Sequence, residues 1–298
     1  YITTVQTSPL VWDVTVITLY FILTATYLLL TIRHDIYHLR SRLPTYFNPL
    51  YSLLTQGYHP NEDRKVSRMA WWLALAVILL APFFLHGGVI PWLFQLMASM
   101  PGWFSPIQAP TFLSIALTSA FAGVIIIAYI FRRVYNWKEL IPDKVFAKMG
   151  TVLAVVAFFF MWFQLQQVIT GAFAPPVGLR IATEAKLESP LFWIISGLII
   201  ISILYLGAQT IWPVLFRIER VVAAAILPLV LTLLEKTLFI VEGLTHPKFD
   251  IYKGVPGSYL PTWVEYSAVL GSVAILVLFF LIVAKVIPVI EAESEHEE

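Results

Sequence analysis

Long, uninterrupted apolar stretches dominate the pattern of this chain. About seven of them reach the length of roughly 20 residues that a helix needs to cross a bilayer. We expect these spans at about Pro9–Ile32, Ala70–Ile90, Ala109–Phe131, Ala147–Phe173, Pro190–Phe216, Ile218–Leu244 and Leu260–Ile287. Lipid offers no hydrogen-bond partner to backbone groups, and the alternation typical of a membrane barrel is missing. The pattern therefore predicts an all-α, multi-pass protein of the cell membrane.

Lysine and arginine lie unevenly on the two sides of these spans. Of the 19 such residues, 14 fall on one set of connections and 4 on the other, and Lys236 lies inside a span. The positive-inside rule then predicts an N-terminus outside and the acidic tail Glu291–Glu298 in the cytoplasm. The uncharged stretch Pro91–Gln108 would lie outside, and its Trp92 and Trp103 favour an interfacial helix or a re-entrant segment.

Composition narrows the chemistry. The chain is 59% hydrophobic and only 12% charged, and its net charge of +1 gives no reason to expect nucleic acid as a partner. Without cysteine it has no disulfide, no iron–sulfur ligation and no thiol chemistry of its own. A pair of axial haem ligands needs two histidines on facing helices, whereas only His86 lies in a predicted span. We expect no haem and no metal site in this chain.

Ionisable residues inside the predicted spans share one depth. Ionisable groups within lipid-spanning helices are costly and usually functional. All the candidates fall in the outer half of the membrane and come from five different predicted spans: Asp13, His86, Glu235, Lys236, Glu242 and Glu265, with Gln164, Gln166 and Gln167 as neutral companions. Asp13 and Glu265 could instead be ordinary charges at a helix N-terminus, which they would stabilise through the helix dipole. For Glu265 this is the preferred interpretation. The common depth predicts a shared polar pocket that opens toward the outer leaflet.

Two ligand classes fit such a pocket. A quinone needs a hydrogen-bond donor, a proton acceptor and an apolar slot, which His86, the carboxylates and aromatic residues such as Trp12 could supply. An ion transporter would use similar carboxylates, usually near the midplane and on broken helices. A retinal protein would require an intramembrane lysine, for which Lys236 is the candidate. Because an ion transporter would use similar carboxylates, a non-redox, ion-translocating or structural membrane subunit is the alternative to a quinone-binding one.

Several stretches resemble the NrfD-like family of membrane subunits related to polysulfide reductase. They occur in the family's order over nearly the whole chain: the Trp-Asp-Val helix start in Ser8–Tyr20, the histidine-containing helix end Leu85–Trp92, the Pro101–Trp103 loop with the next helix start Ala109–Phe112, the pair Glu235–Lys236, and the last helix start Tyr259–Glu265. The closest resemblance is to the longer members found in alternative complex III and in sulfite-reduction-linked complexes.

The resemblance implies two stacked four-helix bundles with a quinone pocket toward the outer face. The family positions that it matches are Asp13, His86 and Glu235–Lys236, and we expect Asp13, His86 and Glu235 to perform the proton chemistry. Around the quinone, which could be menaquinone or another type, we expect Lys236 together with Gln166, Gln167 and Trp12, which the common depth and the aromatic character suggest. Such subunits carry no haem. They exchange electrons with an iron–sulfur subunit docked outside, which serves a separate catalytic subunit.

The chain departs from the family pattern at three points. Leu93 follows Trp92, where the family often has an acidic residue. Lys236 stands where the family commonly has arginine, so a bidentate contact is lost. Helices that precede the Trp-Asp-Val stretch in longer relatives are not in this sequence. We therefore predict that residues 1–107 hold two spans and a long basic cytoplasmic loop from an incomplete first bundle. Residues 108–244 would form the second four-helix bundle, and residues 245–298 the final span and the acidic tail.

The inner half of the spans offers few polar groups. Thr24, Thr151, Ser202 and Gln209 lie there, without a carboxylate deep in a span. We expect that this chain alone lacks a complete file of titratable groups from the cytoplasm to His86 or Glu235. These hydroxyls could also simply bond back to helix carbonyls.

Overall fold

The computed structural model describes residues 9–81, 100, 102–173, 177–245 and 262–287. Every regular element among these residues is a helix. Six helices are long and apolar enough to cross a membrane: α1 (Pro9–Leu39), α5 (Gln108–Val134), α6 (Asp143–Phe173), α8 (Pro190–Ile211), α9 (Ile218–Thr245) and α10 (Trp263–Val286). The predicted all-α, multi-pass membrane architecture is confirmed. The second predicted span begins within α3 (Asp63–Leu80), and its remainder, residues 82–90, lies outside the described residues.

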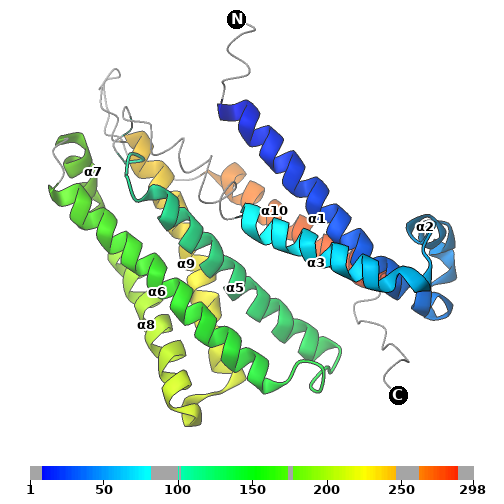
Figure 1. The fold of residues 1–298 in the computed structure, drawn as a ribbon. Coiled ribbons are helices and arrows are strands. Elements are labelled where there is room, and N and C mark those ends of the chain that lie inside the picture. Colours follow the sequence, from blue (N-terminus) through cyan, green and yellow to red (C-terminus); the bar gives the residue numbers. More distant parts are fainter. Residues whose placement is uncertain (1–8, 82–99, 101, 174–176, 246–261, 288–298) are drawn as a thin grey trace, which may run out of the picture. The chain divides into compact units, whose positions relative to one another are not determined.

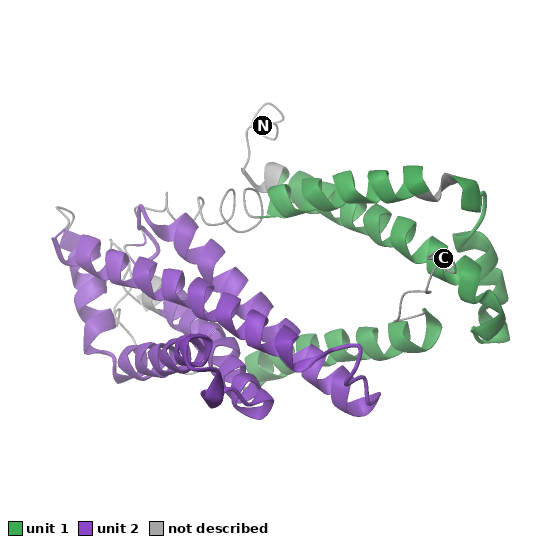
Figure 2. Ribbon diagram, turned by 60° about the horizontal axis from the view of Figure 1, so that its bottom comes forward, with its two compact units in different colours: residues 1–83, 259–298 green, residues 84–258 purple. Residues whose placement is uncertain are grey.

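The chain divides into two compact units, residues 1–83 with 259–298 and residues 84–258 (Figure 2). In the first unit α1 packs against α3 (Figure 1). The basic stretch between them forms short helical elements: η2 (Arg40–Arg42), η3 (Thr45–Phe47), α2 (Asn48–Leu54) and η4 (Pro60–Glu62). The side chain of Arg33 donates to the carbonyl of Gln56 at 2.6 Å, which holds this stretch against α1.

The buried phenol of Tyr51 joins α2 to the end of α10. Its hydroxyl donates to the carbonyl of Val286 at 2.7 Å. Burial raises the pKa of the Tyr51 hydroxyl, so this group keeps its proton and remains a donor. The contact accounts for one of the carbonyls that a helix leaves unpaired at its C-terminus.

Helix α10 has no buried residue and is apolar on all sides, as expected of a helix in lipid. Its N-terminus carries a capping box, in which the Glu265 carboxylate accepts from the backbone N–H of Thr262 at 2.6 Å. The interpretation of Glu265 as a helix N-terminal charge is therefore confirmed.

The second unit holds a four-helix bundle. Helix α5 packs on α6 and α9, and α8 packs on the same two helices, so the four form a closed ring (Figure 1). Small buried residues bring the helices close together, as is usual in membrane bundles: Ala122, Ala154, Ala157, Ala224 and Ala225. Larger side chains such as Phe146 and Phe160 are buried in the core clusters between these helices.

The predicted fifth span runs too far. Helix α8 ends at Ile211 rather than near Phe216, and the short element η6 (Pro213–Leu215) follows. The reason is local, because a residue before proline is disfavoured in the helical conformation, and Trp212 leaves it.

Pro228 lies inside α9, where it cannot donate to the carbonyl of Ala224, four residues earlier. The hydroxyl of Ser202, on α8, donates to this carbonyl at 2.6 Å. Ser202 is 1% exposed, so the bond lies in the core of the bundle. One helix thereby supplies the donor that proline removes from its neighbour.

A short helix, α7 (Val177–Glu188), lies in the segment between α6 and α8 that the spans leave as a loop. It packs chiefly on α6. Gly171 on α6 makes the approach possible, because a Cβ at this position would overlap the side chain of Thr183 on α7. With 12 residues α7 is too short to cross a bilayer.

Candidate functional site

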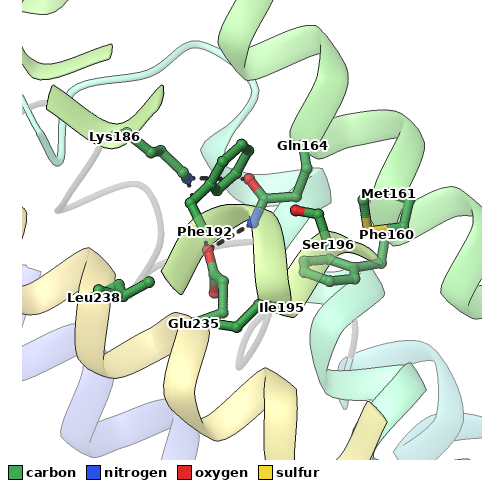
Figure 3. A pocket seen from close by; sticks show the side chains of 9 residues that line it. All are labelled: Phe160, Met161, Gln164, Lys186, Phe192, Ile195, Ser196, Glu235 and Leu238. Carbon is green, nitrogen blue, oxygen red and sulfur yellow. Dashed lines mark hydrogen bonds and ion pairs between the residues drawn. The ribbon is translucent and has the colours of Figure 1, made fainter. Parts of the chain in front are cut away.

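The carboxylate of Glu235 is the centre of a buried polar cluster in the second unit. Helix α9 presents it into the bundle, where the residue is 5% exposed. The amide Nε2 of Gln164, on α6, donates to its Oε1 at 2.7 Å (Figure 3). Two ammonium groups approach the same carboxylate: Lys186 Nζ lies 4.0 Å from Oε1 and Lys236 Nζ 3.7 Å from Oε2. We call these four residues the Glu235 cluster.

Gln164 has a fixed orientation in this cluster. Lys186 Nζ donates to Gln164 Oε1 at 3.2 Å. A lysine ammonium can only donate, so the amide oxygen faces Lys186 and the amide nitrogen faces Glu235. Lys186 therefore interacts with the Glu235 carboxylate in two ways: directly through its charge, and indirectly by orienting the Gln164 amide that donates to it.

Aromatic rings surround Lys236. Its Nζ lies 3.3 Å from the ring centroid of Phe112 on α5 and 5.2 Å from that of Phe239 on α9. The indole of Trp103 donates to the carbonyl of Phe239 at 3.0 Å, which ties the segment before α5 to this cage. Ring faces attract cations most strongly where water is excluded. The site therefore holds the Lys236 side chain between a carboxyl group and two aromatic rings.

A second group of polar side chains lies beside the cluster. Gln167 Nε2 donates to Gln108 Oε1 at 2.9 Å and to the Thr111 hydroxyl at 3.1 Å. Gln164 and Gln167 are three residues apart on α6 and so share a helix face. The amides belong to α5 and α6, and both Gln108 and Thr111 are buried.

Two small cavities adjoin these residues. The Glu235 cavity, of about 10 Å³, is lined by Gln164, Lys186 and Glu235 among apolar side chains (Figure 3). The α7 cavity, of about 40 Å³, lies next to Ser105, Gln108, Gln167 and Thr183. Lys186 lines both of them. Each is the size of one or a few water molecules rather than of a six-membered ring.

The described structure covers part of the predicted site. Glu235 and Lys236 lie together, and Gln167 lies in the neighbouring amide group. Gln166 is half-buried on α6 and two residues from Gln164, so it points away from the face that Gln164 and Gln167 share. Asp13 and Trp12 belong to α1 in the first unit, and their side chains lie outside what is described. His86 and Trp92 lie outside the described residues altogether.

Lys186 and Gln108 lie in these polar groups but were not among the predicted site residues. Lys186 falls in a segment predicted to be an outer loop, so its charge counts there only toward orientation. A signal was present in the spacing: Leu179, Ala182 and Thr183 are buried, and Lys186 follows at the i+7 position of that same helix face. A lysine on the buried face of an amphipathic helix points to a specific partner.

Within the described ranges, no group of three or more His, Asp and Glu side chains is arranged to hold a metal ion. The chemistry that the described cluster can perform is proton binding and hydrogen bonding. The fold and the site thus define a multi-pass helical membrane protein with a buried carboxylate, two ammonium groups and amides inside a four-helix bundle.

The family follows from comparison with known proteins. The family model of NrfD, polysulphide reductase, matches residues 1–248, and this chain belongs to that family. The chain is also 26% identical to a protein of Halobacterium salinarum that is described as a putative membrane subunit of dimethyl sulfoxide reductase, over an alignment of 309 positions. That alignment covers 97% of this chain and 67% of the relative. The resemblance read from the sequence motifs is confirmed.

Proposed function

We propose that this chain is the quinone-interacting membrane subunit of a multisubunit respiratory oxidoreductase. Electrons would pass between a membrane quinone and an iron–sulfur subunit on the outer side, which serves a separate catalytic subunit. Membership of the polysulphide reductase family supports a redox role, and the similarity to a dimethyl sulfoxide reductase membrane subunit supports assembly with such partners.

The observation that carries the proposal is the buried carboxylate of Glu235 between two lysines. A carboxylate inside a membrane bundle is costly unless cations and donors compensate it, and its presence indicates function. Its Oε2 has no hydrogen-bond partner among the described residues, although Lys236 lies 3.7 Å away. A carboxylate oxygen without a hydrogen-bond partner is available as a proton acceptor, which quinol oxidation requires.

The described residues fit the polar chemistry of a quinone head, but the Glu235 cavity does not fit its ring. About 10 Å³ admits one water molecule. The ring would therefore bind outside this cavity, and Asp13, His86 and Trp12 stay proposed contributors to its binding. A quinone supplies the chemistry of two electrons and two protons when bound. The residues of this chain would hold or accept protons, with Glu235 as the acceptor and Lys236 as its charge partner.

Purification from the native membrane tests the proposal. We expect an iron–sulfur protein to co-purify, and the complex to show quinone-dependent electron transfer. A chain that purifies alone and is indifferent to quinone would refute the redox role and favour an ion-translocating or structural subunit.

Two matched variants sharpen that experiment. Glu235→Gln keeps the shape and the bond to Gln164 but removes the proton acceptor, so the quinone-linked rate should fall roughly 100-fold. Glu184→Gln makes the same change on the exposed face of α7, where Glu184 pairs only with Arg180 among the described residues, and should leave the rate unchanged. Equal rates for both variants would exclude Glu235 from the reaction.

A further inference from the structure

Helix α7 brings one charged side chain to a cluster otherwise built from the long helices. The exposed residues of α7 include Arg180 and Glu184, which pair with each other across one turn. Lys186 lies instead on the buried face, with its side chain 14% exposed. The same ammonium lies 5.3 Å from the ring centroid of Phe192 on α8. Its position is defined by contacts to α6, α8 and α9.

Close packing fixes where α7 sits. Gly171 on α6 and Thr183 on α7 touch so closely that a methyl group at position 171 would overlap both the hydroxyl and the Cβ of Thr183. Thr183 Oγ1 donates to the carbonyl of Leu179 in its own helix, so this side chain cannot swing away without losing a bond. Lys186 lies one turn further along the same face. The Gly171 contact therefore sets the distance between Lys186 and the Glu235 cluster.

We propose that Lys186 is a positioning residue of the redox site, and that α7 is the cap that delivers it. Lys186 places a positive charge beside the Glu235 carboxyl group and holds Gln164 with its amide nitrogen toward that group. The 3.2 Å bond to Gln164 Oε1 and the 4.0 Å approach to Glu235 Oε1 carry the inference. Its part in a redox site rests on the proposed function, whereas its control of Glu235 can be measured without any quinone.

Removal of the Lys186 ammonium should change the protonation of Glu235 through two effects that act in the same direction. A buried carboxylate that loses a nearby cation takes up a proton more readily. Gln164 also loses the donor that fixes its oxygen, so its amide can turn that oxygen toward Glu235. An amide oxygen can accept only from a protonated carboxyl. Both effects favour the protonated form of Glu235.

Infrared spectroscopy of the purified complex measures this directly. A protonated carboxyl gives a C=O stretching band distinct from that of the carboxylate, and loss of a band in Glu235→Gln assigns it to Glu235. In Lys186→Met we expect the ratio of protonated to ionised Glu235 to rise roughly tenfold or more over the native protein at the same pH. Lys186→Arg retains a cation and should stay close to the native ratio.

A substitution that displaces α7 without changing Lys186 supplies a second, independent variant. Gly171→Ala leaves Lys186 intact but should push α7 outward, and it should raise the same band as Lys186→Met. Gly123→Ala is the matched control, because a methyl group at Gly123 on α5 meets nothing within 4 Å. Thermal unfolding of each variant verifies that the bundle is intact.

The outcomes separate the two proposals. An unchanged Glu235 band in folded Lys186→Met overturns the role of Lys186, even if quinone activity is normal. A band that responds to Lys186→Met and to Gly171→Ala supports it, even if no quinone activity is found, and then only the proposed function fails. A response to Lys186→Met without one to Gly171→Ala would overturn the role of α7 as the cap.

Discussion

The hydroxyl of Ser202 compensates a carbonyl that Pro228 deprives of its helical donor, and this pair allows a quantitative test of the bundle. Ser202→Ala removes the 2.6 Å bond to the carbonyl of Ala224 and leaves that carbonyl unpaired in the core. An unsatisfied buried acceptor costs about 1–3 kcal/mol in proteins generally. Side-chain hydrogen bonds in a membrane bundle average about 0.6 kcal/mol, with a maximum of about 1.7. We therefore expect a loss of about 1–2 kcal/mol in the free energy of unfolding.

The energy of the Ser202 bond can be isolated by measuring Ser202→Ala a second time in a protein that also carries Pro228→Ala. An alanine at position 228 has an N–H that can donate to the Ala224 carbonyl within α9. In that background Ser202→Ala should cost less than about 0.5 kcal/mol, because the carbonyl keeps a partner. The interaction energy between positions 202 and 228 should then be about 1 kcal/mol, which falls in the range expected for residues that share a partner.

Reversible unfolding in mixed micelles, followed by circular dichroism, gives the four free energies of the cycle. Ser272→Ala in α10 is the matched control. The Ser272 hydroxyl donates to the carbonyl of Ala268, which the backbone N–H of Ser272 also satisfies, so its removal should change little. If Ser202→Ala costs the same with and without Pro228, the hydroxyl does not replace the missing helical donor, and the reasoning is wrong.

Two further predictions concern the proposed site. Lys236→Arg should preserve the quinone-linked rate, whereas Lys236→Met should lower it roughly tenfold or more, because it removes a cation from between the rings of Phe112 and Phe239. Steady-state electron transfer with quinol or quinone measures both variants, and equal rates would show that the charge is not used. The chain has no cysteine, so Asp13→Cys with His86→Cys gives a clean pair for spin labels. We expect dipolar broadening consistent with side chains within about 15 Å, the allowance for a quinone head between them, and its absence would contradict a shared pocket.

The spans were predictable because hydropathy over some 20 residues is a strong signal, and lipid permits few alternatives to a helix. Their ends were less so. Helix α1 continues to Leu39, beyond the apolar run, and its polar last turns contact the segment that follows, as Arg33 does with Gln56. Helix α8 stops before Pro213, where local conformation prevails over an apolar sequence. Neither helix end can be predicted from the length and the hydropathy of the apolar run.

The site was predictable in part. Glu235 and Lys236 stood out because charge inside an apolar run is rare, and Gln164 was named as a companion on the grounds of depth alone. Which glutamine of the three would meet the carboxylate depends on the rotation of α6, which packing determines. Lys186 could not be recognised as a site residue from the sequence, because a lysine in a predicted loop is usually exposed to solvent. Only the tertiary contact of α7 with α6 turns it toward Glu235.

Polar side chains in the second unit differ in what they bond to, and this difference limits where protons can be held. Beside α7 they bond to one another across helices, as Gln164 does with Glu235 and Gln167 with Gln108. Elsewhere in the bundle most hydroxyls donate to helix carbonyls: Ser114 to Thr111, Thr118 to Ser114 and Ser202 to Ala224. Thr151 on α6 is an exception, because its hydroxyl bonds both to the Ala147 carbonyl and, at 2.8 Å, to the hydroxyl of Thr210 on α8.

A hydroxyl committed to a carbonyl has given up its proton as a donor and can relay another only if it breaks that bond. Glu235 is the buried carboxylate among the described residues of this unit. Gln209 is a further exception, with a buried amide whose nitrogen and oxygen have no partner among the described residues, but neither an amide nor a hydroxyl pair such as Thr151–Thr210 holds an extra proton near neutral pH. Proton binding by the described bundle is therefore concentrated at the Glu235 cluster, and a path from the opposite side would have to pass through water and hydroxyls rather than through a file of titratable groups.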